Sequence, residues 1–226
     1  MNTAPLGLSS SEGSVTQRTY QTLRQMIVTG ALKPGQKLKI EGLKEALDTG
    51  ASPIREALSL LTSDNLVERH DQRGFTAANI SQQNFKEILI LRSTLEDLAL
   101  RESIAHATQD WEEKIVVAHH RMVRAEGGDH GDFEQLHKAF HMALLSNAAS
   151  PIMLKYCSQL YDLNIRYRYL AGSSLSYKSR NVGDEHTQII DALVARDADS
   201  ASAELLNHYR LTGEYLSGLL DEGKIV

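Results

Sequence analysis

Apolar and polar positions in the first 80 residues predict three short helices followed by two strands. The first helix is expected to end near Gly30, since glycine is typical of helix C-termini, and a turn at Pro34 and Gly35 separates it from the second helix. The apolar positions that define these two helices are Tyr20, Leu23 and Ile27, then Leu43, Ala46 and Leu47. Residues 66–70 and 75–78 predict the strands. This order of elements is typical of a winged helix-turn-helix.

The third helix has the pattern of a helix that packs on one side and faces a ligand on the other. Ser52 is expected to cap it, with Pro53 at its first position, where a missing amide hydrogen costs nothing. Its apolar residues fall at i, i+3, i+4 and i+7 and are Ile54, Ala57, Leu58 and Leu61. This leaves Arg55 and Ser59 on the solvent-facing side.

A helix of this kind reads base edges in the major groove of DNA, while the wing holds the phosphates. We therefore expect contacts to double-stranded DNA from a set of exposed polar side chains. The set comprises Ser52, Arg55, Ser59, Arg73 at the tip of the wing, Lys33 and Lys44. The alternative is that these are ordinary solvated surface residues.

Beyond residue 80 the pattern changes to helices alone. About six are predicted, with breaks near Thr108, Gly127, Ser150, Gly172 and Asp197. The expected fold is therefore mostly α: an N-terminal winged helix-turn-helix followed by an all-α helical bundle. The expected organisation is a mobile arm over residues 1–15, which is rich in Ser, Gly and Thr, the winged domain over 16–79 and the helical domain over 80–226.

Composition restricts the cellular setting. With 42% apolar and 23% charged residues, the chain resembles an ordinary soluble protein. Neither a membrane-spanning run nor a signal peptide is visible, so we expect a cytoplasmic protein without a membrane partner. A single cysteine, Cys157, offers no disulfide framework and no thiolate metal site.

Charge is distributed unevenly along the chain. The net charge is −5, but residues 1–80 hold 9 Lys and Arg against 8 Asp and Glu, whereas the remainder holds 15 against 21. Because phosphate neutralisation is local, an acidic second half does not argue against DNA binding by the first.

Four histidines of the helical region share the apolar faces of their helices. His137 and His141 are four residues apart, which is a chelating spacing on a helix, while His186 and His208 lie on two further helices. Neutral imidazoles from three helices would suit a divalent transition metal, with Zn²⁺ or Ni²⁺ favoured. The alternative for each histidine is a satisfied core position.

Two arginines also fall in apolar stripes. Arg92 borders the buried face of its helix, where an unpaired guanidinium is costly, although it could pair with Glu96 one turn later. Arg168 shares a stripe with Tyr161 and Asn164. With a metal ion, these side chains would form a small anion pocket inside the bundle.

Three motifs in the first 80 residues resemble the DNA-binding domain of GntR-type bacterial repressors. They are Gly30-x-Leu32-Lys33-Pro34-Gly35, Pro53-Ile54-Arg55-Glu56-Ala57-Leu58 and Arg73-Gly74-Phe75. Two departures matter: Gly50 and Ala51 stand where the family often has Ser or Thr followed by Arg, and Glu41 stands where it has an arginine. The resemblance therefore carries Arg55 over, but leaves the operator sequence open.

The second half resembles the FCD effector domain of the FadR subgroup. The matching motifs are Arg92-x3-Glu96, Phe140-His141, Glu185-His186-x2-Ile189, Arg196-Asp197 and His208. The resemblance implies a metal held by an aspartate and three histidines, and a carboxylate effector that meets the metal and Arg92. His137 occupies the aspartate position, which favours a borderline metal over Mg²⁺ or Ca²⁺.

Segments around His137, Tyr161 and Arg168 are most similar to CsiR-type repressors, which implies a small carboxylic acid such as a dicarboxylate as the effector. The sequence thus predicts a homodimeric, ligand-responsive regulator that represses a catabolic operon. Two alternatives remain: a metal-responsive regulator without an organic effector, and a metal-dependent hydrolase. The hydrolase is disfavoured, because there is no HExxH motif and no carboxylate with an evident general-base position beside the histidines.

Overall fold

The computed structural model describes residues 13–125, 130–172 and 181–225, and the chain divides into two units, residues 1–79 and 80–226. Residues 1–12 of the expected arm lie outside the described part. The first helix begins at Val15, inside the range expected for the arm, and Ser14 caps it.

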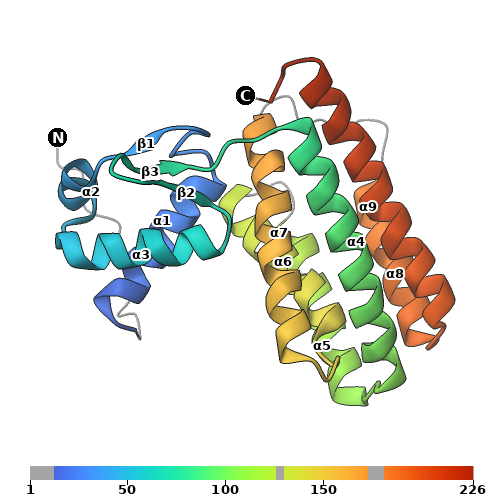
Figure 1. Ribbon diagram of the computed structural model, residues 1–226. Helices are drawn as coiled ribbons and strands as arrows, with labels where there is room; N and C mark the ends of the chain where they lie inside the picture. The colour runs from blue at the N-terminus through green and yellow to red at the C-terminus, as the bar shows by residue number, and fades with distance from the viewer. Residues whose placement is uncertain (1–12, 126–129, 173–180, 226) are drawn as a thin grey trace, which may run out of the picture. The chain divides into compact units, whose positions relative to one another are not determined.

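The N-terminal unit is a winged helix-turn-helix (Figure 1). Its elements are α1 (Val15–Val28), β1 (Lys37–Leu38), α2 (Ile40–Leu47), α3 (Ala51–Ser63), β2 (Val67–His70) and β3 (Gly74–Ala77). The strands form an antiparallel sheet in the order β1-β3-β2, with Leu38 opposite Phe75. β1 was missed from the sequence because two residues are too few to show alternation. Fully buried side chains of α1 and α3, including Leu23, Ile27 and Leu58, form the core of this unit.

The start of α3 differs from the expectation. The helix begins at Ala51, and Gly50 occupies the capping position without a side-chain hydrogen bond. Ser52 is therefore not the cap; its hydroxyl instead donates to Oε1 of Glu56 at 3.2 Å. Pro53 becomes the third helical residue, which is tolerated because amides of the first turn have no partner within the helix.

The C-terminal unit consists of helices in its described residues. They are α4 (Gln82–Ala105), α5 (Gln109–Arg124), α6 (His130–Leu145), α7 (Pro151–Ala171), α8 (Val182–Val194) and α9 (Ala198–Asp221). In the bundle, α4 packs against α7 and α9, α5 packs against α6, and α8 packs against α9 (Figure 1). Among the described residues, no helix is both long enough and apolar enough to cross a membrane.

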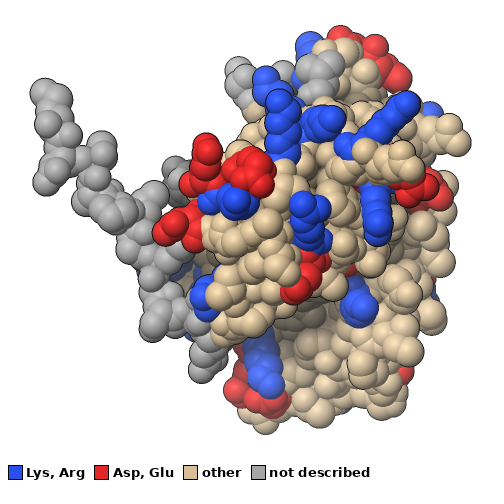
Figure 2. All heavy atoms as spheres, turned by 60° about the vertical axis from the view of Figure 1, so that its left-hand side comes forward, with Lys and Arg blue, Asp and Glu red and all other residues tan. Residues whose placement is uncertain are grey.

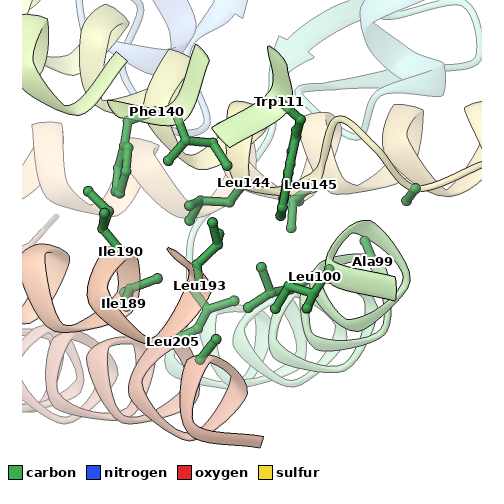
Figure 3. Close-up of a cluster of buried hydrophobic side chains, with 14 of the residues drawn as sticks. Ala99, Leu100, Trp111, Phe140, Leu144, Leu145, Ile189, Ile190, Leu193 and Leu205 are labelled. Atoms are coloured by element: carbon green, nitrogen blue, oxygen red, sulfur yellow. The ribbon is translucent and has the colours of Figure 1, made fainter. Parts of the chain in front are cut away.

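The core of the bundle draws apolar side chains from several helices (Figure 3). Trp111 of α5, Phe140 and Leu144 of α6, Leu193 of α8 and Leu205 of α9 are all buried. Polar side chains occupy an adjacent layer, because the ring of Phe140 also packs against two histidines, with centroids 5.5 Å from His141 and 5.2 Å from His186. This close-packed frame positions the polar groups.

Candidate metal centre and anion site

The four predicted histidines converge inside the bundle. α6 contributes His137 and His141, α8 contributes His186 and α9 contributes His208, and all four side chains are buried. One nitrogen from each ring can be chosen so that the four atoms lie within 4.8 Å of one another. Helical spacing aligned the histidines within α6, and the packing of α8 and α9 brings the other two to them.

Hydrogen bonds on the outer side of the cluster orient three of these rings. Nδ1 of His137 lies 2.6 Å from the hydroxyl of Tyr161, and Nδ1 of His141 lies 3.1 Å from the hydroxyl of Tyr209. Nδ1 of His208 lies 2.8 Å from a carboxylate oxygen of Glu185. In the two histidines of α6, the nitrogens opposite these partners face each other, with Nε2 of His137 and Nε2 of His141 3.3 Å apart.

Burial favours the neutral form of the two histidines of α6. The pKa of His137 is lowered well below its usual value, first by burial and then by the charge of the neighbouring His141. The pKa of His141 is lowered for the same first reason and then by the charge of Arg92. A neutral imidazole is the form that binds a metal ion, so the electrostatics of the cluster suit a metal centre.

Arg92 is held beside the histidines by a buried polar network. Its Nε donates to Oε1 of Glu96 at 2.7 Å, its Nη1 donates to Oδ1 of Asn164 at 2.9 Å, and the hydroxyl of Tyr209 donates to Glu96. The guanidinium also lies over the rings of Tyr161 and Tyr209, 4.7 and 4.3 Å from their centroids. Burial is the largest single influence and lowers the pKa of Arg92, but the charge and hydrogen bond of Glu96, together with the charges of Tyr209 and Tyr161, outweigh it, so the pKa is raised.

The pair with Glu96 is the alternative considered from the sequence, and it is present. It does not exclude a binding role, because Arg92 also meets Asn164 and both tyrosines. The arginine therefore joins α4 to residues of α7 and α9 around the histidines.

Arg168 of α7 pairs with a carboxylate that the sequence analysis did not single out. Its Nη2 lies 3.0 Å from Oε1 of Glu134, and Oε2 of Glu134 lies 3.7 Å from Nδ1 of His137. Glu134 is only 3% exposed. Its position one turn before His137 on the same face of α6 was the sequence signal that could have found it.

Tyr209 was also missed. On α9, Leu211 and Tyr215 lie near the face of His208 but are only half-buried, whereas Tyr209, Thr212 and Leu216 are buried. The buried face shifts gradually around the helix, because a spacing of three or four residues is not a whole turn of 3.6 residues.

Carboxylates do stand beside the histidine cluster, contrary to the expectation from sequence. Glu185 bonds to His208, and Glu134 approaches His137. Both meet the Nδ1 side of a ring, so their positions suit orientation of the histidines.

Several buried polar atoms in this region have no hydrogen-bond partner among the residues that the structure describes. They are Nη2 of Arg92, Nδ2 of Asn164 and both carboxylate oxygens of Glu134. Buried polar groups without partners are costly and uncommon. Because Oε1 of Glu134 is ion-paired with Arg168, two donors and one acceptor, Oε2 of Glu134, are left for a further polar group.

The predicted DNA contacts lie on the N-terminal unit. Arg55 and Ser59 are exposed on α3, Arg73 is exposed in the turn between β2 and β3, and Lys33 is exposed after α1. Lys44 is half-buried and pairs with Glu41 at 2.7 Å. The face in Figure 2 shows basic side chains interspersed with acidic ones. On such a mixed surface, each basic side chain can neutralise only the DNA phosphates next to it.

Comparisons with known proteins agree with these two units. Residues 15–76 match the bacterial regulatory proteins of the gntR family, and residues 87–211 match the FCD domain. The chain is 35% identical over 202 residues to the HTH-type transcriptional regulator BphR of Paraburkholderia xenovorans (strain LB400), covering 86% of this chain and 82% of BphR. It is 30% identical over 201 residues to the HTH-type transcriptional repressor GlaR of Escherichia coli (strain K12), covering 85% and 91%.

The fold has a counterpart among solved structures. The structure of E. coli McbR/YncC superposes with a TM-score of 0.79 at 24% identity, covering 91% of this chain and 98% of that one. These relatives are regulators, so the chain is not an enzyme, and the hydrolase interpretation is set aside. The protein belongs to the GntR family of DNA-binding transcriptional regulators and carries an FCD domain.

Proposed function

We propose that this regulator represses a catabolic operon, and that a small carboxylic acid, bound with a divalent transition metal in the FCD domain, releases it from DNA. The observation that carries the proposal is the buried set of four histidines whose nitrogens lie within 4.8 Å of one another. A regulator has no structural need for four buried imidazoles in one layer of its core, since apolar residues would pack there at lower cost.

The donor set favours Zn²⁺ or Ni²⁺ as the metal. Imidazole nitrogens suit these borderline ions, whereas Mg²⁺ and Ca²⁺ prefer oxygen ligands. Tyr161, Tyr209 and Glu185 support this choice, because the oxygen of each can accept a hydrogen bond from Nδ1 of a ring in the tautomer that leaves Nε2 for the ion. The bound ion supplies positive charge for an anionic effector.

The effector contacts are proposed to come from α4 and α7. Arg92 and Asn164 each have a buried donor without a partner in the described chain, and Tyr161 lies between them and His137. Arg168 contributes a second cation on the other side of His137. Donors of this kind recognise a carboxylate.

We expect operator binding through the winged unit. Arg55, Ser52 and Ser59 would face the bases of an operator, and Arg73, Lys33 and Lys44 the phosphates. Binding to the chromosome would locate the protein in the cytoplasm. Its partners would then be double-stranded DNA, the acid and a second copy of the chain.

An exposed apolar stripe on α4 supports the homodimer. Ile90 and Leu98 are 66% and 56% exposed and lie on one face of the helix, with Leu91 beside them at 46%. Two copies could cover the same stripe in an isologous contact and present two recognition helices to a palindromic operator. Leu98→Glu should increase the monomer fraction in sedimentation velocity, whereas the control Glu214→Gln, at an exposed site on α9, should not.

A route for the signal leaves the site along α7. Tyr167 follows Asn164 by one turn, and its hydroxyl donates to Oδ1 of Asn84 at 2.8 Å and lies 3.3 Å from the backbone of Ser81. Ser81 caps α4, two residues after the boundary between the units. A shift of α7 on effector binding would therefore reach the start of α4, with Tyr167 as a positioning residue.

Metal analysis and DNA binding test the proposal together. Purified wild-type protein and the exposed-site control His120→Ala should hold about one metal ion per chain, and His141→Ala should lose it. A DNA fragment selected from a random pool by the wild-type protein then serves as the probe in fluorescence anisotropy. The proposal requires that at least one small carboxylic acid weakens this binding in the metal-loaded protein and does not do so in His141→Ala.

Each failure has its own meaning. If neither protein holds metal after reloading with Zn²⁺ or Ni²⁺, the histidines are structural. If metal alone changes DNA affinity and no acid does, the protein is a metal sensor, and Arg92→Ala should then leave the response intact. The buried cation pairs argue against that outcome, because a pure metal sensor does not need them.

A further inference from the structure

Helix α5 carries three exposed valines in addition to the side chains that it buries. Trp111 and Met122 lie in the core of the bundle, whereas Val116, Val117 and Val123 are 49%, 46% and 42% exposed. Valine is a poor helix former, because its branched side chain loses rotamer freedom in a helix. A solvated helix face gains nothing from three such residues, so the valines indicate a surface that another chain covers.

The exposed residues around Val117 have the spacing of a contact between two helices. Asp110, Glu113, Val117, His120 and Arg124 follow one another in steps of three and four residues, and all five are exposed. This alternation is the heptad spacing with which one helix presents a continuous stripe to another. We call these five residues the α5 seam.

Charge changes sign along the α5 seam. Asp110 lies seven residues before Val117 and Arg124 seven residues after it, while Glu113 and Arg121 lie four residues before and four residues after it. Both arginines are exposed and form no ion pair in the part of the chain that the structure describes. The helix macrodipole favours acidic residues early and basic residues late, but it requires neither the equal spacing about Val117 nor the valines.

This arrangement makes the α5 seam complementary to itself. When two α5 helices run antiparallel with Val117 against Val117, Asp110 of each copy faces Arg124 of the other, and Glu113 faces Arg121. Opposite charges then meet on both sides of an apolar centre. A parallel arrangement would place like charges together, which is repulsive.

We propose that α5 is a self-association surface, on which two copies of the chain pair in antiparallel orientation about a two-fold axis at Val117. The occupant is a second copy, because an isologous contact requires a surface that is complementary to itself. The pair of Lys114 with Asp110 at 2.6 Å does not oppose this contact, since both side chains are exposed and such a pair one turn apart contributes little.

The contact through α5 is separate from the apolar stripe of α4 that supports the homodimer. Used together, the two surfaces build a dimer of dimers, which can hold two operators at once. One pair of helices buries less surface than a standard protein–protein interface, so the α5 contact should be weak and should weaken further with added salt.

Sedimentation velocity of the full-length protein tests the α5 contact at chain concentrations from about 1 to 200 µM, the range of a weak interface. In Arg124→Asp, acidic side chains face one another, so association through α5 should be at least about tenfold weaker than in wild type. Asp110→Arg added to Arg124→Asp makes the facing charges opposite again and should restore the affinity to within about threefold. The matched control Arg210→Asp, at an exposed arginine of α9, should assemble like wild type.

The doubly reversed chain separates charge pairing between copies from an effect on the helix itself, because only pairing is restored by the second reversal. The proposal is wrong if Arg124→Asp assembles like wild type, or if the doubly reversed chain does not regain the wild-type assembly. Val117→Lys places two like charges on the axis and should also prevent the contact, which decides the matter even if the Arg124 variant does not fold.

The outcomes also separate the α5 contact from the homodimer through α4. Leu98→Glu alone should still self-associate through α5, and Leu98→Glu combined with Arg124→Asp should be monomeric. If Leu98→Glu has no effect and Arg124→Asp alone gives monomers, the α5 contact stands and only the assignment of α4 is wrong.

Discussion

Replacement of Tyr209 by phenylalanine tests whether the hydrogen bonds around the histidines set metal affinity. The Tyr209 hydroxyl lies 3.1 Å from Nδ1 of His141 and donates to Glu96, and the side chain is 2% exposed. When Nε2 of His141 binds an ion, Nδ1 carries the proton and needs an acceptor. The tyrosine oxygen is that acceptor.

The magnitude follows from what the variant leaves behind. Phenylalanine keeps the ring and its packing but leaves the Nδ1 proton of His141 buried without a partner, which costs about 1–3 kcal/mol. This corresponds to roughly a 10- to 100-fold weaker zinc affinity, the usual range for the loss of a partner behind a ligand. The metal-free variant should also be less stable by about 1–3 kcal/mol, because Glu96 loses a donor.

Competition for Zn²⁺ against a chromophoric chelator measures the affinity, and urea unfolding in EDTA measures the stability. Tyr156→Phe is the matched control, since Tyr156 lies on α7 and is 52% exposed. The reasoning fails if Tyr209→Phe binds zinc within twofold of wild type. That result would mean that His141 does not bind the ion through Nε2.

Three further predictions concern the rest of the chain. Gly35→Ala should destabilise the protein by about 1–2 kcal/mol, because Gly35 has φ +70° and a Cβ there would lie 2.8 Å from Oδ1 of Asn79. Urea unfolding measures this change, and Gly42→Ala, at a helical site with open space, should instead increase the free energy of unfolding. Burial, with a smaller effect from a nearby glutamate, raises the pKa of the Cys157 thiol to about 12, so alkylation by iodoacetamide at pH 8, followed by mass spectrometry, should be slower by roughly three orders of magnitude than in urea; equal rates would contradict this. The two buried histidines of α6 have pKa values lowered by burial, so below about pH 6.5 the unfolded chain binds protons that the native chain does not. The free energy of unfolding of the metal-free protein should therefore decrease as the pH is lowered, by up to about 2.7 kcal/mol per pH unit for the two histidines together. A free energy of unfolding that stays constant between pH 7.5 and 5.5 would refute this.

Local rules were sufficient for most of the fold. Helical periodicity and breaks at residues such as Ser150, Gly172 and Asp197 identified the helices of the bundle, because capping and turn preferences act over a few residues. The same rules failed where two local choices compete. Gly50 rather than Ser52 occupies the capping position of α3, and the two-residue β1 is formed by pairing with β3.

The sequence by itself identified the first candidate residues of the site: two histidines one turn apart on α6, two more on inward faces, and arginines in apolar stripes. These follow from composition and helical geometry alone. Only the tertiary structure decided which groups meet. The pairing of Arg168 with Glu134, the contact of Tyr209 with His141 and that of Glu185 with His208 each join different helices. Helix periodicity orients a side chain on its own helix, whereas its partner across the core depends on how the helices pack.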